Sequence, residues 1–261
     1  SYAGDDGEGS LRQVIADAET GDTIEFGGEM EILLNTPITI GKNIVIDGAN
    51  VVTISGGQAT SIFKITSGNV EIKSLTLRDG LAQGGNGENS GRLDRHASGG
   101  GGAGMGGAIA VQGGIVLIDG VKFIDNKVKG GNGGNSTAPV GSTDYAGAGG
   151  GSNFGSGASR NNWGAPAKGT AGGFGGGGSG GLEYGGDTGG GTGGFGAGGG
   201  GGASGFWSYY TFEHKGSPGQ AGLFGGAGSV GQTMSYKGQG AGYGGGGGGG
   251  AGLGGALFIK S

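Results

Sequence analysis

Short stretches of alternating apolar and polar residues recur along the first half of the chain and again at its C-terminal end. In each stretch two apolar side chains lie two positions apart, which is typical of a β-strand with one buried face. Glycine, asparagine and aspartate stand between the stretches, as expected for tight corners. The apolar pairs are Ile38/Ile40, Ile44/Ile46, Val52/Ile54, Phe63/Ile65, Val70/Ile72, Leu75/Leu77, Ile109/Val111, Val116/Ile118, Val121/Phe123 and Leu257/Ile259.

The pairs fall into groups of three, and each group occupies roughly 20–25 residues, as a coil of a parallel β-helix does. Stacked coils bury their inward side chains in ladders, which one coil alone cannot do. Residues 63–65, 109–111 and 257–259 align as equivalent strands of successive coils. The sequence therefore predicts an all-β protein built on a right-handed parallel β-helix.

The same alignment locates two insertions, both after the third strand of a coil. Because both leave the stack at the same corner, we expect them to form one glycine-rich lobe. The predicted organisation is a cap and first coils at 1–81, a first insertion at 82–105, a coil at 106–129, a large insertion at 130–253 and a final strand at 254–261.

Residues 10–18 predict a short helix that caps the N-terminal end of the coil stack. Ser10 is a favourable N-cap, and Gln13 stands three positions later, as in a capping box. Apolar residues then recur at helical spacing. The predicted apolar face consists of Leu11, Val14, Ile15 and Ala18.

Glycine accounts for 81 of the 261 residues and is concentrated in the two insertions. Acidic and basic residues balance in the larger insertion, so the high net charge that usually accompanies disorder is absent. A flexible coil is one interpretation of this composition. Regularly spaced aromatic residues favour instead extended, polyglycine II-like helices, whose backbone groups bond to neighbouring segments. The spaced residues are Tyr145, Phe154, Trp163, Phe174, Tyr184, Phe195 and Phe206.

Charge and cysteine content narrow the class of protein. The net charge of −5 gives no indication of nucleic-acid or anionic-membrane binding, and no apolar run approaches the roughly 20 residues of a membrane-spanning helix. Cysteine is absent, which excludes disulfides and thiolate metal sites. The first residues, Ser1-Tyr2-Ala3, suit either a mature N terminus after signal cleavage or a trimmed chain. The first interpretation places the protein outside the cell or on its surface.

A Gly-Gly-Ala-Ile/Leu motif occurs twice, and the first copy is followed by Phe123-Ile124-Asp125-Asn126. In these motifs the framework resembles the polymorphic outer-membrane protein repeats of bacterial surface adhesins. Residues 9–15 and 22–26 look like the cap and first strand of secreted bacterial β-helix proteins. The resemblance implies a β-helix with a role at the cell surface. Its motif residues are Gly106, Gly107, Ala108, Ile109, Phe123, Asn126, Gly254, Gly255 and Ala256.

The glycine-rich lobe separately resembles the polyglycine-helix bundles of some phage tail-tip adhesins and of springtail antifreeze proteins, on composition. At a coil corner, the side-chain amide of Asn126 is expected to satisfy free backbone groups of the turn. Phe123 is expected to fill the interior of the coil.

No group of residues predicts catalysis. His96 and His214 lie beside glycine-rich segments, where solvated loop histidines are expected. Asp5, Asp6 and Glu8 carry oxygen ligands suited to a hard cation, but the favourable charge at a helix N terminus also explains them. β-Helix polysaccharide lyases and hydrolases need several acids on one outer face. We expect no enzyme, metal or cofactor site here, because corners explain most of the outer acids, Asp47, Asp79, Asp119 and Asp125.

The densest aromatic cluster of the chain lies between two glycine tracts. Aromatic side chains are enriched at recognition surfaces, and the alternative is that the cluster packs the lobe against the coils. The candidate partner-binding residues are Phe206, Trp207, Tyr209 and Tyr210.

The final strand, Leu257, Phe258 and Ile259, has no visible cap and is expected to offer unpaired backbone groups to a second copy. Head-to-tail stacking would give a filament; a trimmed chain that lacks further coils is the alternative. The sequence therefore predicts a structural, adhesive fibre subunit whose partners are itself and a surface glycan or protein. A receptor-binding adhesin that does not polymerise and an ice-binding protein are the rival interpretations.

Overall fold

The computed structural model describes residues 5–90, 97–135, 145–159, 161–162, 168–181, 189–203, 217–229 and 245–260. Apart from one helix, the described secondary structure consists of β-strands. The chain divides into two compact units. Unit 1 comprises Ser1–Ala82, Met105–Val128 and Gly254–Ser261, and unit 2 comprises Gln83–Gly104 and Lys129–Leu253. Both glycine-rich insertions thus belong to unit 2.

Helix α1 (Leu11–Asp17) begins after Ser10, whose side chain accepts a hydrogen bond from the Gln13 N–H at 3.2 Å. The reciprocal half of the capping box does not form, because the Ser10 N–H donates to the Gly7 carbonyl. Leu11 and Ile15 are buried in the core of unit 1, whereas Val14 is 39% exposed. The predicted helix is confirmed, and its buried face is narrower than expected.

The larger sheet of unit 1 is parallel along its main path. This path runs from β1 (Thr23–Glu25) through β4 (Ile44–Ser55) and β6 (Asn69–Arg78) to β10 (Ile115–Asp119). β2 (Met30–Leu33) pairs with β4, and β11 (Lys122–Ile124) pairs with β6. The register places Ile46 beside Ile72 and Ile72 beside Ile118, which forms one of the inward ladders.

The second sheet of unit 1 is also parallel, in the order β16 (Leu257–Ile259), β9 (Ile109–Val111), β5 (Phe63–Ile65) and β3 (Ile38–Ile40). Phe63 pairs with Ile38 on one side and Ile109 on the other, and Ile109 also pairs with Leu257. This register is the one expected from the sequence alignment of these segments.

Side chains from α1 and both sheets form one buried apolar cluster. Its members alternate along the strands with outward residues, so the period-two pattern does decide which face is buried. The large side chains of this cluster with no exposed surface are Ile46, Ile54, Ile62, Phe63, Ile65, Ile72, Leu77 and Ile109.

The corners of the larger sheet differ from expectation. The sequence predicts separate strands on either side of each corner, whereas β4 and β6 continue through theirs and change register between Asp47 and Val52. Ala49, Asn50 and Ser74 adopt left-handed backbone conformations there, with φ of 46°, 63° and 53°. Such residues bend the chain within a few positions, so that pairing resumes at once on the far side of the corner.

The remaining strands are short. β7 (Leu81–Gln83) pairs with β12 (Lys127–Lys129), β8 (Gly104–Met105) with β15 (Gly252–Leu253), and β13 (Tyr145–Ala146) with β14 (Asn161–Asn162). The first four of these strands contain or adjoin the points at which the chain passes between the units.

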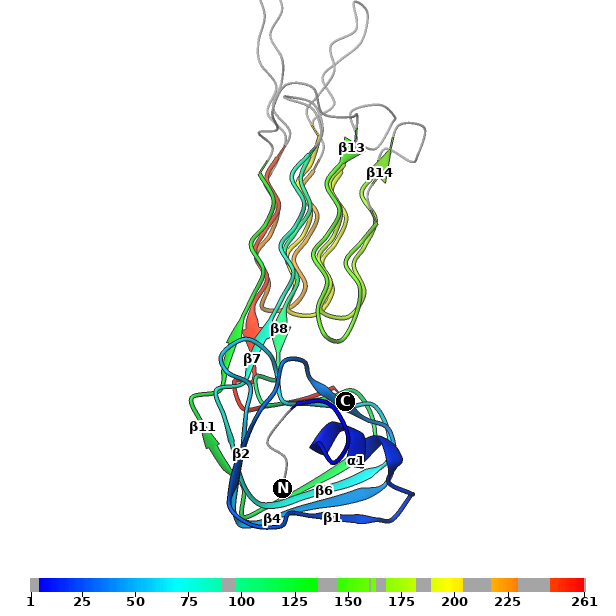
Figure 1. Ribbon diagram of the computed structural model, residues 1–261. Coiled ribbons are helices and arrows are strands. Elements are labelled where there is room, and N and C mark those ends of the chain that lie inside the picture. Colours follow the sequence, from blue (N-terminus) through cyan, green and yellow to red (C-terminus); the bar gives the residue numbers. More distant parts are fainter. Residues whose placement is uncertain are drawn as a thin grey trace, which may run out of the picture. The chain divides into compact units, whose positions relative to one another are not determined.

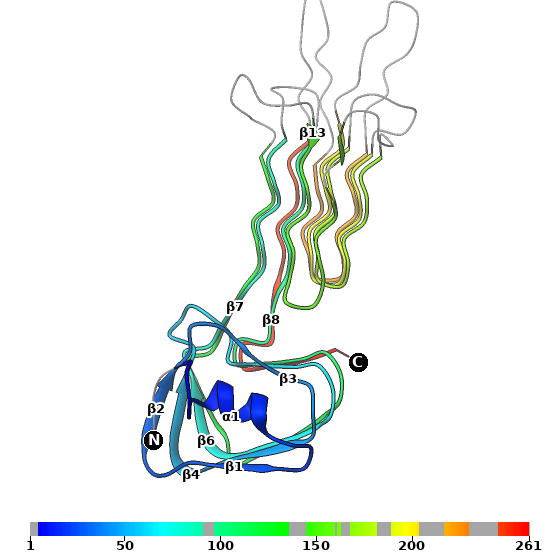
Figure 2. The same cartoon turned by 45° about the vertical axis from the view of Figure 1, so that its right-hand side comes forward.

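Unit 2 is built from extended segments that run alongside one another in both views (Figures 1 and 2). Their backbone groups pair in several directions, most completely around residues 97–104. The N–H groups of this segment donate in rotation to three neighbouring segments, so that residues three apart share one neighbour. Ala97, Gly100 and Ala103 donate to Gly181, Gly178 and Gly175; Ser98, Gly101 and Gly104 donate to Gly245, Gly248 and Ala251; Gly99 and Gly102 donate to Glu88 and Gly85.

The carbonyl groups of the same segment accept hydrogen bonds from three further segments. A strand in a sheet bonds to neighbours on two sides only, so this arrangement is not a sheet. The donors to the 97–102 carbonyls are Gly131 and Gly134, Gly147 and Gly150, and Gly198 and Gly201.

Glycine is required for this packing because the segments approach one another through their backbones. A Cβ atom built on Gly100 would lie 2.1 Å from the carbonyl oxygen of Gly198 and 2.5 Å from its carbonyl carbon. Backbone atoms cannot rotate away as the end of a side chain can. The absence of a side chain is therefore what permits the contact.

Aromatic side chains form a row at turns of unit 2. The ring centroids of Phe154 and Phe174 are 5.9 Å apart, those of Phe174 and Phe195 are stacked at 5.1 Å, and those of Phe195 and Phe224 meet edge-on at 5.9 Å. These separations fall in the range of favourable ring pairs. Three members of the predicted aromatic spacing thus lie together; the side chains of Tyr145, Trp163, Tyr184 and Phe206 are outside the described residues.

Candidate functional site

One end of unit 1 leaves apolar side chains uncovered. β10 is the last strand on the main path of the larger sheet. Its outward residues Ile115 and Leu117 are 69% and 56% exposed. Its inward residues Val116 and Ile118 are only half-buried, although the residues that they pair with on β6 are fully buried. The inner ladders of unit 1 therefore end on an exposed apolar surface, which we call the open end.

The opposite end of unit 1 is covered by α1. Leu11 and Ile15 are 4% and 3% exposed and belong to the same buried cluster as Ile24 of β1 and Ile32 of β2. In Figure 2 the helix lies inside the outline of the strands. Within the described part of unit 1, the inward residues are thus covered at the α1 end and accessible at the β10 end.

The backbone of β10 also offers hydrogen-bonding groups at the open end. The Ile115 N–H donates to the Gly68 carbonyl of the neighbouring chain segment at 2.9 Å. Because backbone groups point alternately to the two sides of a strand, those of Leu117 also face β6. The N–H and C=O groups of Val116 and Ile118 then face the side on which no described strand pairs with β10.

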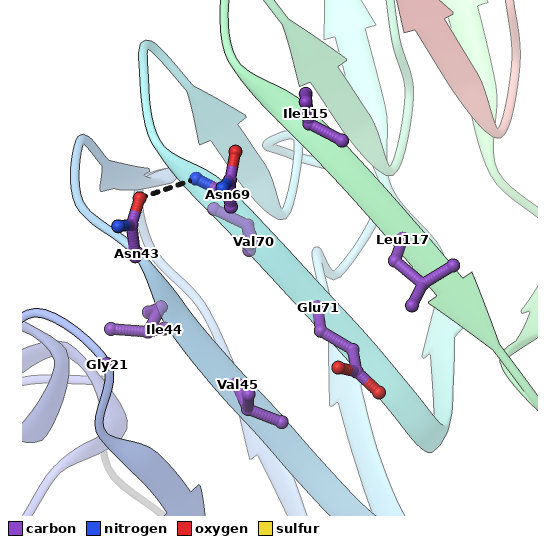
Figure 3. Close-up of a pocket in the computed structure, with 9 residues that line it drawn as sticks. All are labelled: Gly21, Asn43, Ile44, Val45, Asn69, Val70, Glu71, Ile115 and Leu117. Carbon is purple, nitrogen blue, oxygen red and sulfur yellow. Dashed lines mark hydrogen bonds between the residues drawn. The ribbon is translucent and has the colours of Figure 1, made fainter.

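An open groove of about 380 Å³ crosses the outer face of the sheet beside this edge (Figure 3). Val45, Glu71 and Leu117 occupy one register row across β4, β6 and β10. The Asn69 N–H donates to the Asn43 side-chain oxygen at 2.8 Å at one end of the groove. The groove is mainly apolar, with the Glu71 carboxylate between two aliphatic side chains. Such a surface is suited to contact with another apolar surface rather than to proton transfer.

A row of charged residues lies next to the groove. The Nζ of Lys73 is 3.3 Å from Oδ2 of Asp47, and Glu25 and Asp119 continue the row on β1 and β10. The pKa of Asp47 lies below its usual value, chiefly because the Ala49 N–H donates to its carboxylate and also because Lys73 is close. The carboxylate is thus held ionised as part of a corner, as the sequence suggested for the outer acids.

The residues predicted for partner binding, Phe206, Trp207, Tyr209 and Tyr210, lie outside the described residues. So do His96 and His214. The predicted assembly strand, Leu257, Phe258 and Ile259, is β16, the edge strand of the second sheet, and Ile259 is 58% exposed. The Asp5 carboxylate accepts hydrogen bonds from the Arg12 side chain and from the Asn35 N–H. It therefore connects the N-terminal segment to α1 and to the chain after β2.

The repeat motif has a structural explanation. Gly106 and Gly254 both adopt left-handed conformations, with φ of 72° and 65°, at equivalent corners. The two copies stack directly, since the N–H groups of Ala108 and Ile109 both donate to the Ala256 carbonyl. A Cβ on Gly107 would lie 2.1 Å from the Gly255 carbonyl oxygen, so the close approach of the two copies requires glycine.

Asn126 bonds to the backbone as expected. Its Oδ1 accepts from the Gly80 N–H at 2.8 Å, and its Nδ2 donates to the Leu77 carbonyl at 2.9 Å. Phe123 is half-buried and packs against the core cluster.

Sequence reasoning missed the outward residues Ile115 and Leu117. Alternation in the sequence identifies Val116 and Ile118 as an inward pair, but it does not identify Ile115 and Leu117 as an exposed apolar surface. The available signal is the uninterrupted apolar run 115–118, since the neighbouring strand β6 carries Asn69 and Glu71 at the positions of Ile115 and Leu117. A run that is apolar on both faces predicts a strand covered on both sides, and this one is not covered within the described part of unit 1.

Within the described residues, no group of three or more His, Cys, Asp or Glu side chains is placed to hold a metal ion. The described helix is also too short to cross a membrane. No family model, curated protein or solved structure matches this chain.

Proposed function

We propose that this chain is a non-enzymatic structural and adhesive protein of the cell surface that assembles with itself through the open end of unit 1. The observation that supports self-assembly is the contrast between a helix-covered end and an end with exposed Ile115 and Leu117. Covering such a surface with a second copy removes apolar area from water. It also satisfies the free backbone groups of an edge strand.

In this proposal unit 1 is a right-handed parallel β-helix. From β2 to β6, successive strands alternate between the two sheets, and equivalent corner residues such as Asn43 and Asn69 are 26 residues apart. Right-handed connection is the rule for parallel strands joined by a crossover. The role of unit 1 is then that of a rigid support.

Unit 2 is, in the same proposal, a bundle of polyglycine II-like helices. The rotation of donors around residues 97–104 repeats every three residues, which is the number per turn of that helix. Adhesion is assigned to the aromatic residues Phe206, Trp207, Tyr209 and Tyr210 on their sequence and on the resemblance to surface adhesins. A surface glycan or protein is the proposed ligand.

Sedimentation velocity of the 261-residue chain over a range of concentrations tests the self-assembly. We expect concentration-dependent association that Leu117→Lys weakens at least about 100-fold, because an apolar contact is lost and a charge would be buried without a partner. Val51→Lys is the matched control: Val51 is 44% exposed at a corner of β4, away from β10. A wild-type chain that stays monomeric, or equal effects of the two substitutions, would contradict the proposal.

A further inference from the structure

We propose that Asn132 is a site of spontaneous covalent modification in unit 2, and that the fold protects Asn86, which stands in the same local sequence. The reaction is closure of the asparagine side chain onto the backbone nitrogen of the next residue. It needs no enzyme and no partner chain, so the inference is independent of the proposed self-assembly.

The chain contains two asparagines that are followed by glycine, and their immediate surroundings in the sequence are identical. Residues 84–87 and 130–133 both read Gly-Gly-Asn-Gly. An Asn-Gly pair deamidates readily, because asparagine is thermolabile and glycine has no side chain to hinder attack by its nitrogen. Asn86 and Asn132 are also both exposed. Local sequence and solvent access therefore do not distinguish the two sites, whereas their hydrogen bonds do.

The chemistry defines which hydrogen bonds matter. At Asn132, the Gly133 nitrogen would lose its proton to solvent and form a bond to Cγ of the asparagine. The Nδ2 group takes up a proton and leaves as ammonia, which closes a five-membered succinimide ring. Water then opens the ring at either of its carbonyl carbons and gives aspartate or isoaspartate. Hydrogen bonds that hold the backbone N–H or the side-chain amide therefore slow the reaction, because they must first be broken.

Both reacting groups of the Asn86 site are held by the backbone of Asn132. The Asn132 N–H donates to Oδ1 of Asn86 at 2.9 Å, and the Gly87 N–H donates to the Asn132 carbonyl at 2.8 Å. The side-chain amide of Asn86 thus bonds to the neighbouring segment instead of turning towards the Gly87 nitrogen. Ring closure at Asn86 requires both hydrogen bonds to break.

Neither reacting group of the Asn132 site is held in this way. Among the described residues, none accepts a hydrogen bond from the Gly133 N–H, and none bonds to the Asn132 side chain. The N–H groups of Gly131 and Gly134, by contrast, donate to carbonyl groups of residues 97–104. The nucleophile and the electrophile are therefore both available at Asn132, in a segment that is otherwise bonded into the bundle.

The packing of unit 2 fixes the glycine that makes this site reactive. A Cβ on Gly133 would lie 1.8 Å from the Gly247 carbonyl oxygen, so a side chain does not fit there. Isoaspartate would insert one extra carbon into the backbone between Gly131 and Gly134, whose N–H groups bond three residues apart to the same neighbour. The three-residue repeat would be broken at that point, and the segment would lose its register with residues 97–104.

Peptide mapping by mass spectrometry, after incubation of the full chain in mildly alkaline buffer, tests the inference. Trypsin places Asn86 and Asn132 in different peptides. In the folded chain we expect Asn132 to deamidate at least about ten-fold faster than Asn86, the difference that the net strength of one or two hydrogen bonds gives. In concentrated urea the two rates should agree, because the flanking residues are the same.

Asn132→Gln is the matched variant, because glutamine keeps the side-chain amide but closes its larger ring much more slowly. Hydrogen exchange of the aged wild type should show lost protection at residues 131–134, and the aged variant should keep that protection. Equal rates at the two asparagines in the folded chain, faster reaction at Asn86, or an Asn132 that does not react would overturn the inference. The same loss of protection in the variant would show that modification of Asn132 is not its cause.

Discussion

Unit 1 and unit 2 achieve order by opposite means. In unit 1 the strands stand at sheet spacing, and isoleucine, valine, leucine and phenylalanine fill the space between the sheets. In unit 2 the described segments approach through their backbones, and hydrogen bonds between backbone groups join one segment to as many as six others. Hydrophobic burial stabilises the first unit, and main-chain hydrogen bonds with close backbone packing stabilise the second.

The difference teaches that the two units should tolerate opposite kinds of substitution. Removing methyl groups from unit 1 leaves a cavity among side chains that cannot fully collapse. Adding one methyl group to a glycine of unit 2 that lies against a neighbouring backbone forces the two segments apart and breaks hydrogen bonds between them. A residue that is too small damages the first unit, and a residue that is too large damages the second.

The largest effect is expected for Gly100→Val. The first added carbon alone would lie 2.1 Å from a backbone oxygen of Gly198, and residues 97–104 bond to six neighbouring segments. We expect a loss of at least about 4 kcal/mol, at the high end of overpacking effects. Hydrogen exchange of the full chain should show lost protection in the described segments of unit 2, while β4 and β6 stay protected.

Ile72→Ala provides the mirror experiment in unit 1. Ile72 has no exposed surface and stands between Ile46 and Ile118 in an inward ladder. We expect a destabilisation of about 3 kcal/mol, typical of a buried isoleucine reduced to alanine, with exchange increased in β4, β6 and β10 and unchanged in residues 97–104. If either substitution unprotected both units equally, the two would form one cooperative system and the comparison would fail.

The sequence predicts unit 1 well because side-chain patterns determine it. Phe63, Ile109 and Leu257 occupy the register that their alignment predicts, since shifting a strand by one residue would turn its apolar side chains outward. The sequence does not predict that β4 continues through its corner. This continuity depends on the left-handed backbone conformations of Ala49 and Asn50, and the alternation of apolar and polar residues gives no information about them.

Unit 2 is predicted only in outline. Phe154, Phe174 and Phe195 mark the positions of turns, and their spacing is visible in the sequence. Which segments neighbour residues 97–104 is not visible, because consecutive glycines carry no side chain that distinguishes one register from the next. At the open end, the uninterrupted apolar run 115–118 is visible in the sequence, but the absence of a described strand beside β10 appears only in the structure.

A smaller effect sharpens the comparison within a single segment of unit 2. A Cβ on Gly247 would lie 1.9 Å from the Gly99 carbonyl oxygen, whereas a Cβ on the adjacent Gly246 meets nothing nearer than 3.5 Å. We expect Gly247→Ala to destabilise by about 1–3 kcal/mol. Gly246→Ala should stabilise by about 0.5 kcal/mol, because alanine restricts the unfolded chain more than glycine does. Thermal unfolding of both variants measures the two signs; a similar loss for each would mean that backbone contact is not what selects glycine here.

The smallest effect is expected from lowering the pH, which should reduce the stability of unit 1 and leave the backbone hydrogen bonds of unit 2 unchanged. The pKa of Asp47 is lowered in the folded protein, first by the hydrogen bond from the Ala49 N–H and then by Lys73. A carboxyl group with a lowered folded pKa stabilises the fold above its unfolded pKa of 3.8 and loses that contribution as the pH falls through the folded value. Asp47→Asn lacks the charge at every pH, so urea unfolding should show a small deficit relative to the wild type at pH 6 that narrows towards pH 3. The hydrogen-exchange protection of residues 97–104 should not change over this pH range, because backbone amide and carbonyl groups do not titrate there. A stability deficit of Asp47→Asn that stays constant from pH 6 to pH 3 would mean that the charge of Asp47 contributes nothing to stability.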